Sequence, residues 1–249
     1  MKVVIMVLFA VSVSSAPGIY DRKIIPGEDV TFWKDAITVE GDILVPPASE
    51  RLAAIGLANP WPKGEVAYQV APRAVMFLEY INGAIWHIQN NTCIRFKETS
   101  TGPRLYFVYT GDCQSFIGKI REPVQPLEIG NACENIGGMV HEILHALGFG
   151  HEHKRSDRDN YVKINYENIL TDDYPLFEKY NPTFNILLND FDYDSIMLYG
   201  EYTGNNGVTG AKSMESKNPG QRLLEPGEKG KMSKGDIEKV NEYYRCTRM

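Results

Sequence analysis

The most constraining feature of this chain is a cluster of histidines, because four of its five fall between positions 141 and 153. The cluster begins with the pattern H-E-x-x-H, formed by His141, Glu142 and His145. On a helix, residues four apart lie one turn apart on the same face, so both imidazoles can bind one metal ion. Glu142 lies beside them, close enough to contact a water molecule without being a ligand. The pattern therefore predicts a metal site on a helix.

The residues after the second histidine extend this site. Gly148 follows three residues later, where helices commonly end in a left-handed turn that glycine adopts without strain. The chain can then reverse and deliver His151 as a third nitrogen ligand. Three neutral imidazoles without a thiolate, and a fourth position open to water, are typical of a catalytic zinc site. The full pattern H-E-x-x-H-x-x-G-x-x-H is that of the metzincins, which we favour over a helix that binds nothing.

Two longer segments narrow the resemblance. Residues 148–161, GFGHEHKRSDRDNY, resemble the astacin signature around the third histidine. Residues 192–199, DYDSIMLY, resemble the methionine turn of that family. The resemblance covers about residues 61–246, and one position departs from it: Leu198 stands where astacins usually carry histidine. Tyr199 keeps its place, so we expect zinc binding to persist.

The resemblance implies a fold and a role for each site residue. The fold class is α+β, a two-lobed astacin-like catalytic domain with the zinc cleft between its lobes. The N-terminal lobe is expected to hold a twisted sheet with mostly antiparallel edges and two long helices, and the C-terminal lobe mainly loops plus a last helix. The implied roles are one zinc ion held by His141, His145 and His151, a general base in Glu142, an oxyanion donor and resting zinc ligand in Tyr199, and an apolar floor in Met197.

The N-terminus has the features of a secreted precursor. Lys2 precedes an apolar run over residues 3–13 and the small residues 14–16, which predicts a signal peptide at residues 1–16. The alternative is a buried core strand. The run is shorter than the roughly 20 apolar residues that span a bilayer, so we expect an extracellular protein without a membrane anchor. Asn90 begins a glycosylation sequon.

Residues 17–51 are rich in proline and acidic residues and lack helical periodicity, which suggests a propeptide before a peptidase domain at residues 52–249. Gly41-Asp42 resembles the short element of astacin propeptides whose aspartate occupies the water position of the zinc. A carboxylate oxygen is a good fourth ligand, so it would exclude the nucleophile. Cleavage is expected near Arg51, and the resemblance implies that Glu152 anchors the new α-amino group.

All four cysteines lie beyond residue 51, and an even number in a chain with a signal peptide predicts two disulfides with three possible pairings. Spacing alone does not choose between them. The family resemblance implies Cys93–Cys246 and Cys113–Cys133. A zinc site made of cysteines is the rival interpretation, but the chain has no C-x-x-C pair.

Residues 52–249 hold 21 basic and 25 acidic residues, a net charge of −4, which argues against nucleic acid or anionic membranes as partners. We expect polypeptide substrates and a monomer. Two other classes of function stay open: a zinc protein that binds without catalysis, because Leu198 departs from the family, and a zinc hydrolase acting on another kind of bond. The intact Glu142 argues against the first.

Hydrophobic spacing also predicts the main elements. Residues 124–129 are expected to form an edge strand, because Pro126 cannot donate in a central ladder. In astacins a strand at this place borders the cleft and pairs with extended substrate, which favours polypeptide over other substrates. Ser233 is expected to cap the last helix. The remaining elements are strands at residues 64–70, 93–97 and 104–109 and helices at 72–90 and 141–147.

Overall fold

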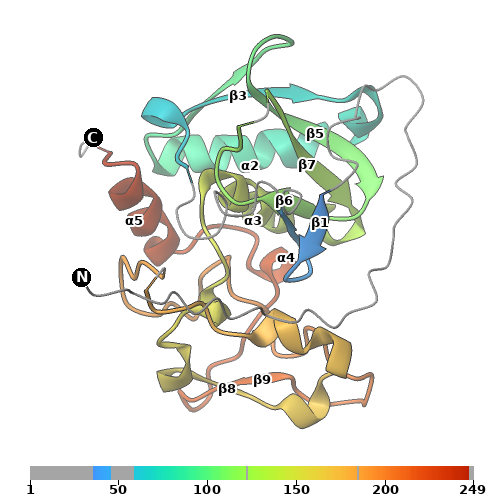
Figure 1. Cartoon of the computed structure of the whole chain (residues 1–249), viewed down its shortest axis with the longest axis vertical. Helices are drawn as coiled ribbons and strands as arrows, with labels where there is room; N and C mark the ends of the chain where they lie inside the picture. The colour runs from blue at the N-terminus through green and yellow to red at the C-terminus, as the bar shows by residue number, and fades with distance from the viewer. Residues whose placement is uncertain (1–35, 46–58, 122, 184, 247–249) are drawn as a thin grey trace, which may run out of the picture.

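The computed structural model describes residues 36–45, 59–121, 123–183 and 185–246. Figure 1 shows two halves, one holding a large sheet with the long helices and the other built from loops around a short β8–β9 pair. The predicted signal peptide and the cleavage region near Arg51 lie outside the described residues. Among the described residues, no helix combines the length and apolar character needed to cross a bilayer.

The main sheet has seven strands in the order β1-β2-β6-β7-β5-β3-β4. Its interior pairs β5–β7 and β3–β5 are parallel, as is the edge pair β3–β4. Antiparallel pairing occurs at the other end, in β6–β7 and β1–β2. The expected antiparallel pairing is therefore present at the β1 edge of the sheet and not at the β4 edge. The strands are β1 (Ile37–Val39), β2 (Ile43–Val45), β3 (Glu65–Val70), β4 (Arg95–Glu98), β5 (Arg104–Gly111), β6 (Gln114–Phe116), β7 (Val124–Gly130), β8 (Val162–Ile164) and β9 (Met214–Ser216).

The expectation that residues 124–129 form an edge strand is wrong. Strand β7 lies between β5 and β6, inside the sheet. The proline is tolerated because β6 is short: its registered pairs with β7 involve only Leu127 and Glu128, and the ladder ends before Pro126. Strand β2 pairs in parallel with the free side of β6. If residues 36–45 are left aside, the sheet ends at β6, which is then the strand expected to border the cleft.

The two long helices pack against each other and against the sheet in one hydrophobic core. The last helix, α5, begins after Ser233, whose hydroxyl accepts a hydrogen bond from the amide of Asp236, as predicted. The helices are α2 (Leu78–Asn91), α3 (Ile136–Leu147), α4 (Pro226–Lys229) and α5 (Lys234–Tyr243). Short 3-10 helices are η2 (Pro62–Gly64), η3 (Pro72–Phe77), η4 (Asn131–Cys133), η5 (Glu152–Lys154), η6 (Arg158–Asn160), η7 (Tyr166–Asn168) and η8 (Thr171–Phe177).

Two disulfides join these parts, and both have the pairing that the resemblance implied. Cys93–Cys246 connects the end of α2 to the end of α5, across 153 residues of sequence. Cys113–Cys133 connects the start of β6 to η4, just before α3. Closing a loop as long as the first stabilises the folded chain by about 4–5 kcal/mol in the chain-entropy model. The second disulfide holds the start of β6 against η4, the segment that leads into the histidine helix.

Candidate metal and catalytic site

Helix α3 positions the first two histidines. It begins after Asn135, whose side chain accepts a 2.7 Å hydrogen bond from the amide of Gly138. It ends at Gly148, where φ is 113°, a left-handed conformation that glycine adopts without a Cβ clash. His141 and His145 lie one turn apart and are buried. Because the chain reverses at Gly148, the residues that follow return toward the same face.

The hydrogen bonds of these rings determine which lone pairs are free. Nδ1 of His141 donates to the carbonyl of Ile196 at 2.8 Å, and Nδ1 of His145 donates to that of Phe149 at 2.7 Å. A carbonyl only accepts, so Nε2 of each neutral ring keeps its lone pair. Burial lowers the pKa of His145 to about 4, which keeps that ring neutral. The two Nε2 atoms are 3.0 Å apart, so both can face one metal ion.

His151 and Asp42 complete a cluster of four donor groups. Oδ2 of Asp42 lies 3.1 Å from Nε2 of His151 and 3.2 Å from Nε2 of His141, and its Oδ1 lies 3.7 Å from Nε2 of His145. All four ligand atoms lie within 4.8 Å of one another. Zinc bonds of about 2.0–2.1 Å in a tetrahedron place the ligands roughly 3.4 Å apart, so the set fits this ion. Oδ1 has no hydrogen-bond partner among the described residues, which suits a ligand oxygen.

Glu142 is buried beside this cluster with few polar partners. Its Oε1 lies 3.3 Å from Sγ of Cys113, which has no hydrogen to donate because it is disulfide-bonded. Its Oε2 has no hydrogen-bond partner in the described part of the chain. Burial, and then the negative charges of Asp42 and Glu128, raise the pKa of Glu142 well above its usual range. A buried carboxyl group with a raised pKa beside a metal site is suited to proton transfer.

The methionine turn is fixed from helix α5. One carboxylate oxygen of Asp236 accepts from the hydroxyl of Ser195 at 2.6 Å, and the other accepts from the amide of Ile196 at 2.8 Å. Lys229 donates to the carbonyls of Ser195 and Leu198, at 2.7 Å each. Met197 is buried in the main hydrophobic core, as the floor role requires. The turn is therefore held by charged groups from outside the histidine segment.

Leu198 and Tyr199 belong to the same hydrophobic cluster, but only Tyr199 also reaches the metal cluster. Leu198 is fully buried in a second hydrophobic cluster in the C-terminal lobe, so its side chain takes no part in the metal cluster. The hydroxyl of Tyr199 donates to the carbonyl of Glu40 at 2.6 Å and lies 3.1 Å from Oδ2 of Asp42. The departure from the family thus falls on a packing position, while the neighbouring tyrosine reaches the site.

Glu152, predicted to anchor a new N-terminus, is buried and already has several partners. Its Oε1 accepts from the amide of Asp192 at 2.9 Å and lies 3.2 Å from Arg155, and its Oε2 accepts from Lys239 at 2.6 Å. Burial raises the pKa of Glu152, although these two cations oppose the shift. Residues 46–58, where the new terminus would arise, lie outside the described residues, so the anchor role stays a prediction.

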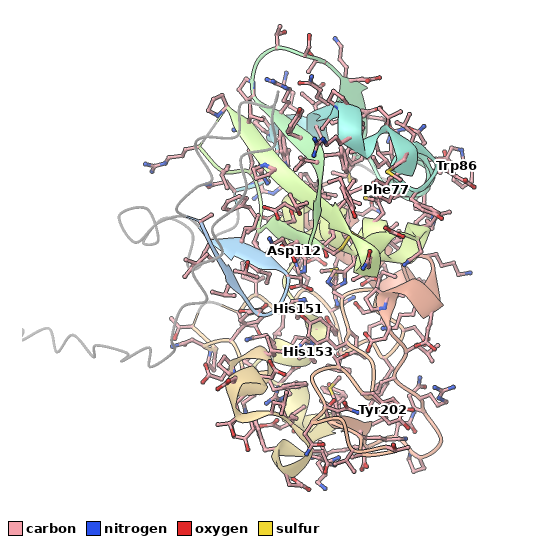
Figure 2. The ribbon with its side chains drawn as sticks, turned by 90° about the vertical axis from the view of Figure 1, so that its right-hand side faces the viewer. Phe77, Trp86, Asp112, His151, His153 and Tyr202 are labelled. Atoms are coloured by element: carbon pink, nitrogen blue, oxygen red, sulfur yellow. A yellow bond between two sulfur atoms is a disulfide. The ribbon has the colours of Figure 1, made fainter. Side chains whose placement is uncertain are left out.

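Three further residues at the site, Glu40, Lys154 and Tyr180, carried no sequence signal. Glu40 lies between Lys154, Tyr180 and His151, with Tyr180 donating to its carboxylate at 2.9 Å. Figure 2 shows His151 and His153 at the level where the β1–β2 hairpin meets the C-terminal lobe. Contacts between residues more than a hundred positions apart do not follow from any local pattern.

Known proteins resemble the chain over most of its length. The profile of the astacin peptidase family matches residues 54–245. Astacin-like metalloprotease toxin 1 from Loxosceles intermedia is 38% identical over 213 residues, which are 84% of this chain and 81% of that protein. The solved structure of High choriolytic enzyme 1, a hatching enzyme zinc-protease from Oryzias latipes, has a TM-score of 0.67 and 31% identity, covering 78% of this chain and 97% of that one.

These matches confirm the expected α+β fold and decide between the classes of function left open by the sequence. A profile that spans nearly all of the region after residue 51 favours a peptidase over a zinc protein without catalysis or a hydrolase of another bond. The similarity to a solved zinc-protease extends over most of the chain. The chain therefore belongs to the astacin family and is a zinc metalloendopeptidase.

Proposed function

We propose that the chain is the zymogen of a secreted endopeptidase that hydrolyses peptide bonds in extended polypeptides. The observation that carries the proposal is the convergence of three imidazoles on the carboxylate of Asp42, with Glu142 beside them. His141, His145 and His151 would hold one zinc ion. Because every ligand comes from a single chain, the site is compatible with a monomer.

When bound, zinc lowers the pKa of water and polarises the scissile carbonyl. Glu142 accepts the proton of the attacking water and passes it to the leaving amine. Its raised pKa supports this role, because a carboxylate of higher pKa takes the proton of water more readily. Asp42 differs: although burial opposes ionisation, the histidines around it hold its pKa well below the usual range, which suits a carboxylate ligand.

Tyr199 would stabilise the oxyanion. Burial, followed by the negative charge of Asp42, raises its pKa well above the ordinary value, so the hydroxyl stays protonated and can donate. With residues 36–45 in place it donates to the carbonyl of Glu40. After their removal the same donor can turn to the developing charge on the substrate oxygen. The family resemblance adds a role as resting zinc ligand.

We assign residues 1–16 to a signal peptide, 17–51 to the prosegment and 52–249 to the peptidase domain. The β1–β2 hairpin supports the second assignment, because it adds a strand at β6 and brings Asp42 to the histidines. The amide of Ser115 donates to the carbonyl of Asp42 at 2.9 Å. Removal of the prosegment would free this edge for an extended substrate. Two disulfides and relatives named as a toxin and a hatching enzyme support secretion.

The proposal is tested by digesting a peptide library with the Arg51-cleaved chain and identifying the products by mass spectrometry. We expect internal cleavages that disappear when zinc is chelated and return when zinc is restored. The uncleaved chain, loaded with zinc in the same way, is the control and should give far fewer cleavage products. Cleavage that persists without zinc, or no cleavage by zinc-loaded cleaved chain, would contradict the proposal.

A further inference from the structure

Two residues before Asp42, the prosegment places a second carboxylate against the catalytic domain. Oε2 of Glu40 accepts a 2.9 Å hydrogen bond from the hydroxyl of Tyr180 and lies 3.3 Å from Nδ1 of His151. Its Oε1 lies 3.4 Å from Nζ of Lys154. One carboxylate is thus surrounded by a cation and two donors, which is the composition of an anion-binding pocket.

Lys154 is built into the wall of this pocket. Its side chain is 5% exposed, and its ammonium also donates to the carbonyl of Pro175 at 2.8 Å. In the described part of the chain, Glu40 is the only residue whose carboxylate lies within 4.0 Å of this ammonium. A buried ammonium is unfavourable without a counter-ion, so the pocket favours an acidic occupant.

The turn that carries both carboxylates has an unusual backbone conformation. Glu40 has a φ of 56° and Gly41 a φ of 85°. Glycine adopts this left-handed region freely, whereas for glutamate it is uncommon. A residue other than glycine keeps such a conformation where its contacts compensate for the strain. For Glu40 these contacts are the pocket and the 2.6 Å hydrogen bond from Tyr199 to its carbonyl.

The pocket also involves the outer nitrogen of the third histidine. His141 and His145 donate from Nδ1 to main-chain carbonyls of the catalytic domain itself. His151 instead directs Nδ1 to Glu40, a side chain of the prosegment. A carboxylate on the outer nitrogen orients an imidazole toward a metal. Glu40 therefore contacts Nδ1 of His151, whereas Asp42 contacts Nε2, the nitrogen that faces the other ligands.

We propose that Lys154, Tyr180 and Nδ1 of His151 form a carboxylate-binding pocket in which Glu40 anchors the prosegment in addition to Asp42. The inference rests on the proposed zymogen function, because it concerns how residues 36–45 are retained over the site. If only the carboxylate of Asp42 were lost, the hairpin would still be held by the ion pair between Glu40 and Lys154. Full release would require the loss of both carboxylates.

Hydrogen–deuterium exchange of the zinc-loaded intact chain tests this pocket without any turnover. All samples carry Glu142→Gln, so that self-cleavage does not alter them. In Glu40→Gln, we expect the amides of residues 43–45 to exchange about tenfold faster or more, as befits the loss of one charge-assisted interaction. Lys154→Met should have a similar effect. The double variant should exchange no faster than Glu40→Gln alone, because that change already removes the ion pair with Lys154.

Two further variants distinguish the pocket from a general loosening of the fold. Lys179→Met removes a half-exposed lysine, paired with Asp159 at 2.6 Å, and should leave exchange in residues 43–45 unchanged. Adding Asp42→Asn to Glu40→Gln should speed exchange beyond either single change, because each carboxylate contacts a different nitrogen of His151. Unchanged exchange in Glu40→Gln, or independent effects of Glu40→Gln and Lys154→Met, would overturn the pocket. Either result would leave the peptidase proposal standing, since that is judged by cleavage.

Discussion

The hydroxyl of Tyr199 lies 3.1 Å from Oδ2 of Asp42, the same oxygen that lies 3.1–3.2 Å from two of the three histidines. The carboxylate of the prosegment and the donor proposed for catalysis therefore meet at one point. In the intact chain this point is taken by Asp42. In the cleaved chain the same position would be occupied by the attacking water and the substrate oxygen. Latency and catalysis would therefore depend on one position.

Replacing Asp42 with alanine should make the uncleaved chain partly active. The change removes the carboxylate from the metal cluster but leaves Glu40 in its pocket, so we expect measurable hydrolysis that stays below that of the cleaved chain. Adding Glu40→Gln should raise it further. A fluorogenic peptide assay on uncleaved protein measures both. Equal, negligible activity in the parent and in Asp42→Ala would mean that the prosegment inhibits by steric cover alone.

Tyr199→Phe should lower catalysis without removing the metal. Loss of one oxyanion donor typically lowers kcat by roughly 10²–10³-fold, while KM should change little because the bond forms mainly in the transition state. Zinc content should stay near one ion per chain, since three imidazoles remain. Steady-state kinetics and metal analysis of the cleaved variant provide the measurement. A kcat within about threefold of the parent, which is only about 0.65 kcal/mol of barrier, would make Tyr199 a packing residue.

Leu198→Ala should lower stability and leave zinc in place. Leu198 is fully buried in the second hydrophobic cluster, so truncation should reduce the free energy of unfolding by about 2–5 kcal/mol. Denaturant unfolding of the disulfide-intact protein measures this change, and metal analysis measures zinc. Loss of zinc from folded Leu198→Ala would show instead that this position supports the site directly.

Lys229 should make stability depend on pH in the alkaline range. Burial lowers its pKa from 10.5 to about 8, although Asp236 and Glu225 oppose the shift. Because the folded chain binds this proton less tightly than the unfolded chain, the unfolding free energy should rise as pH increases from about 8 to 10.5. Relative to Lys229→Met, the parent should gain on the order of 1–3 kcal/mol over this window. A constant difference between the two unfolding profiles would contradict this assignment.

The histidine helix could be predicted from sequence because its information is local. The i, i+4 spacing of His141 and His145 and the glycine at position 148 specify a helix face and its end without reference to any other segment. The cap at Ser233 is local in the same way. The disulfide pairing was accessible only through the family resemblance, because the spacing of four cysteines leaves three pairings open.

The position of β7 and the role of Glu40 could not be predicted because both depend on distant pairing. A proline usually marks an edge, but Pro126 is tolerated inside the sheet because the registered pairs of β6 with β7 end at Leu127. The partners of Glu40 lie 111 and 140 residues further along the chain. The β8–β9 pair was missed because strands of three residues are too short to show a period.

The most direct test of the central claim is the turnover of Glu142→Gln in the zinc-loaded, Arg51-cleaved chain. Glutamine preserves the shape of the side chain but cannot serve as a base at neutral pH. We predict that peptide cleavage falls by at least about 10²–10⁴-fold while zinc content stays near one ion per chain. Turnover within about threefold of the parent, with zinc still bound, would contradict the assignment of Glu142 as the base and the mechanism built on it.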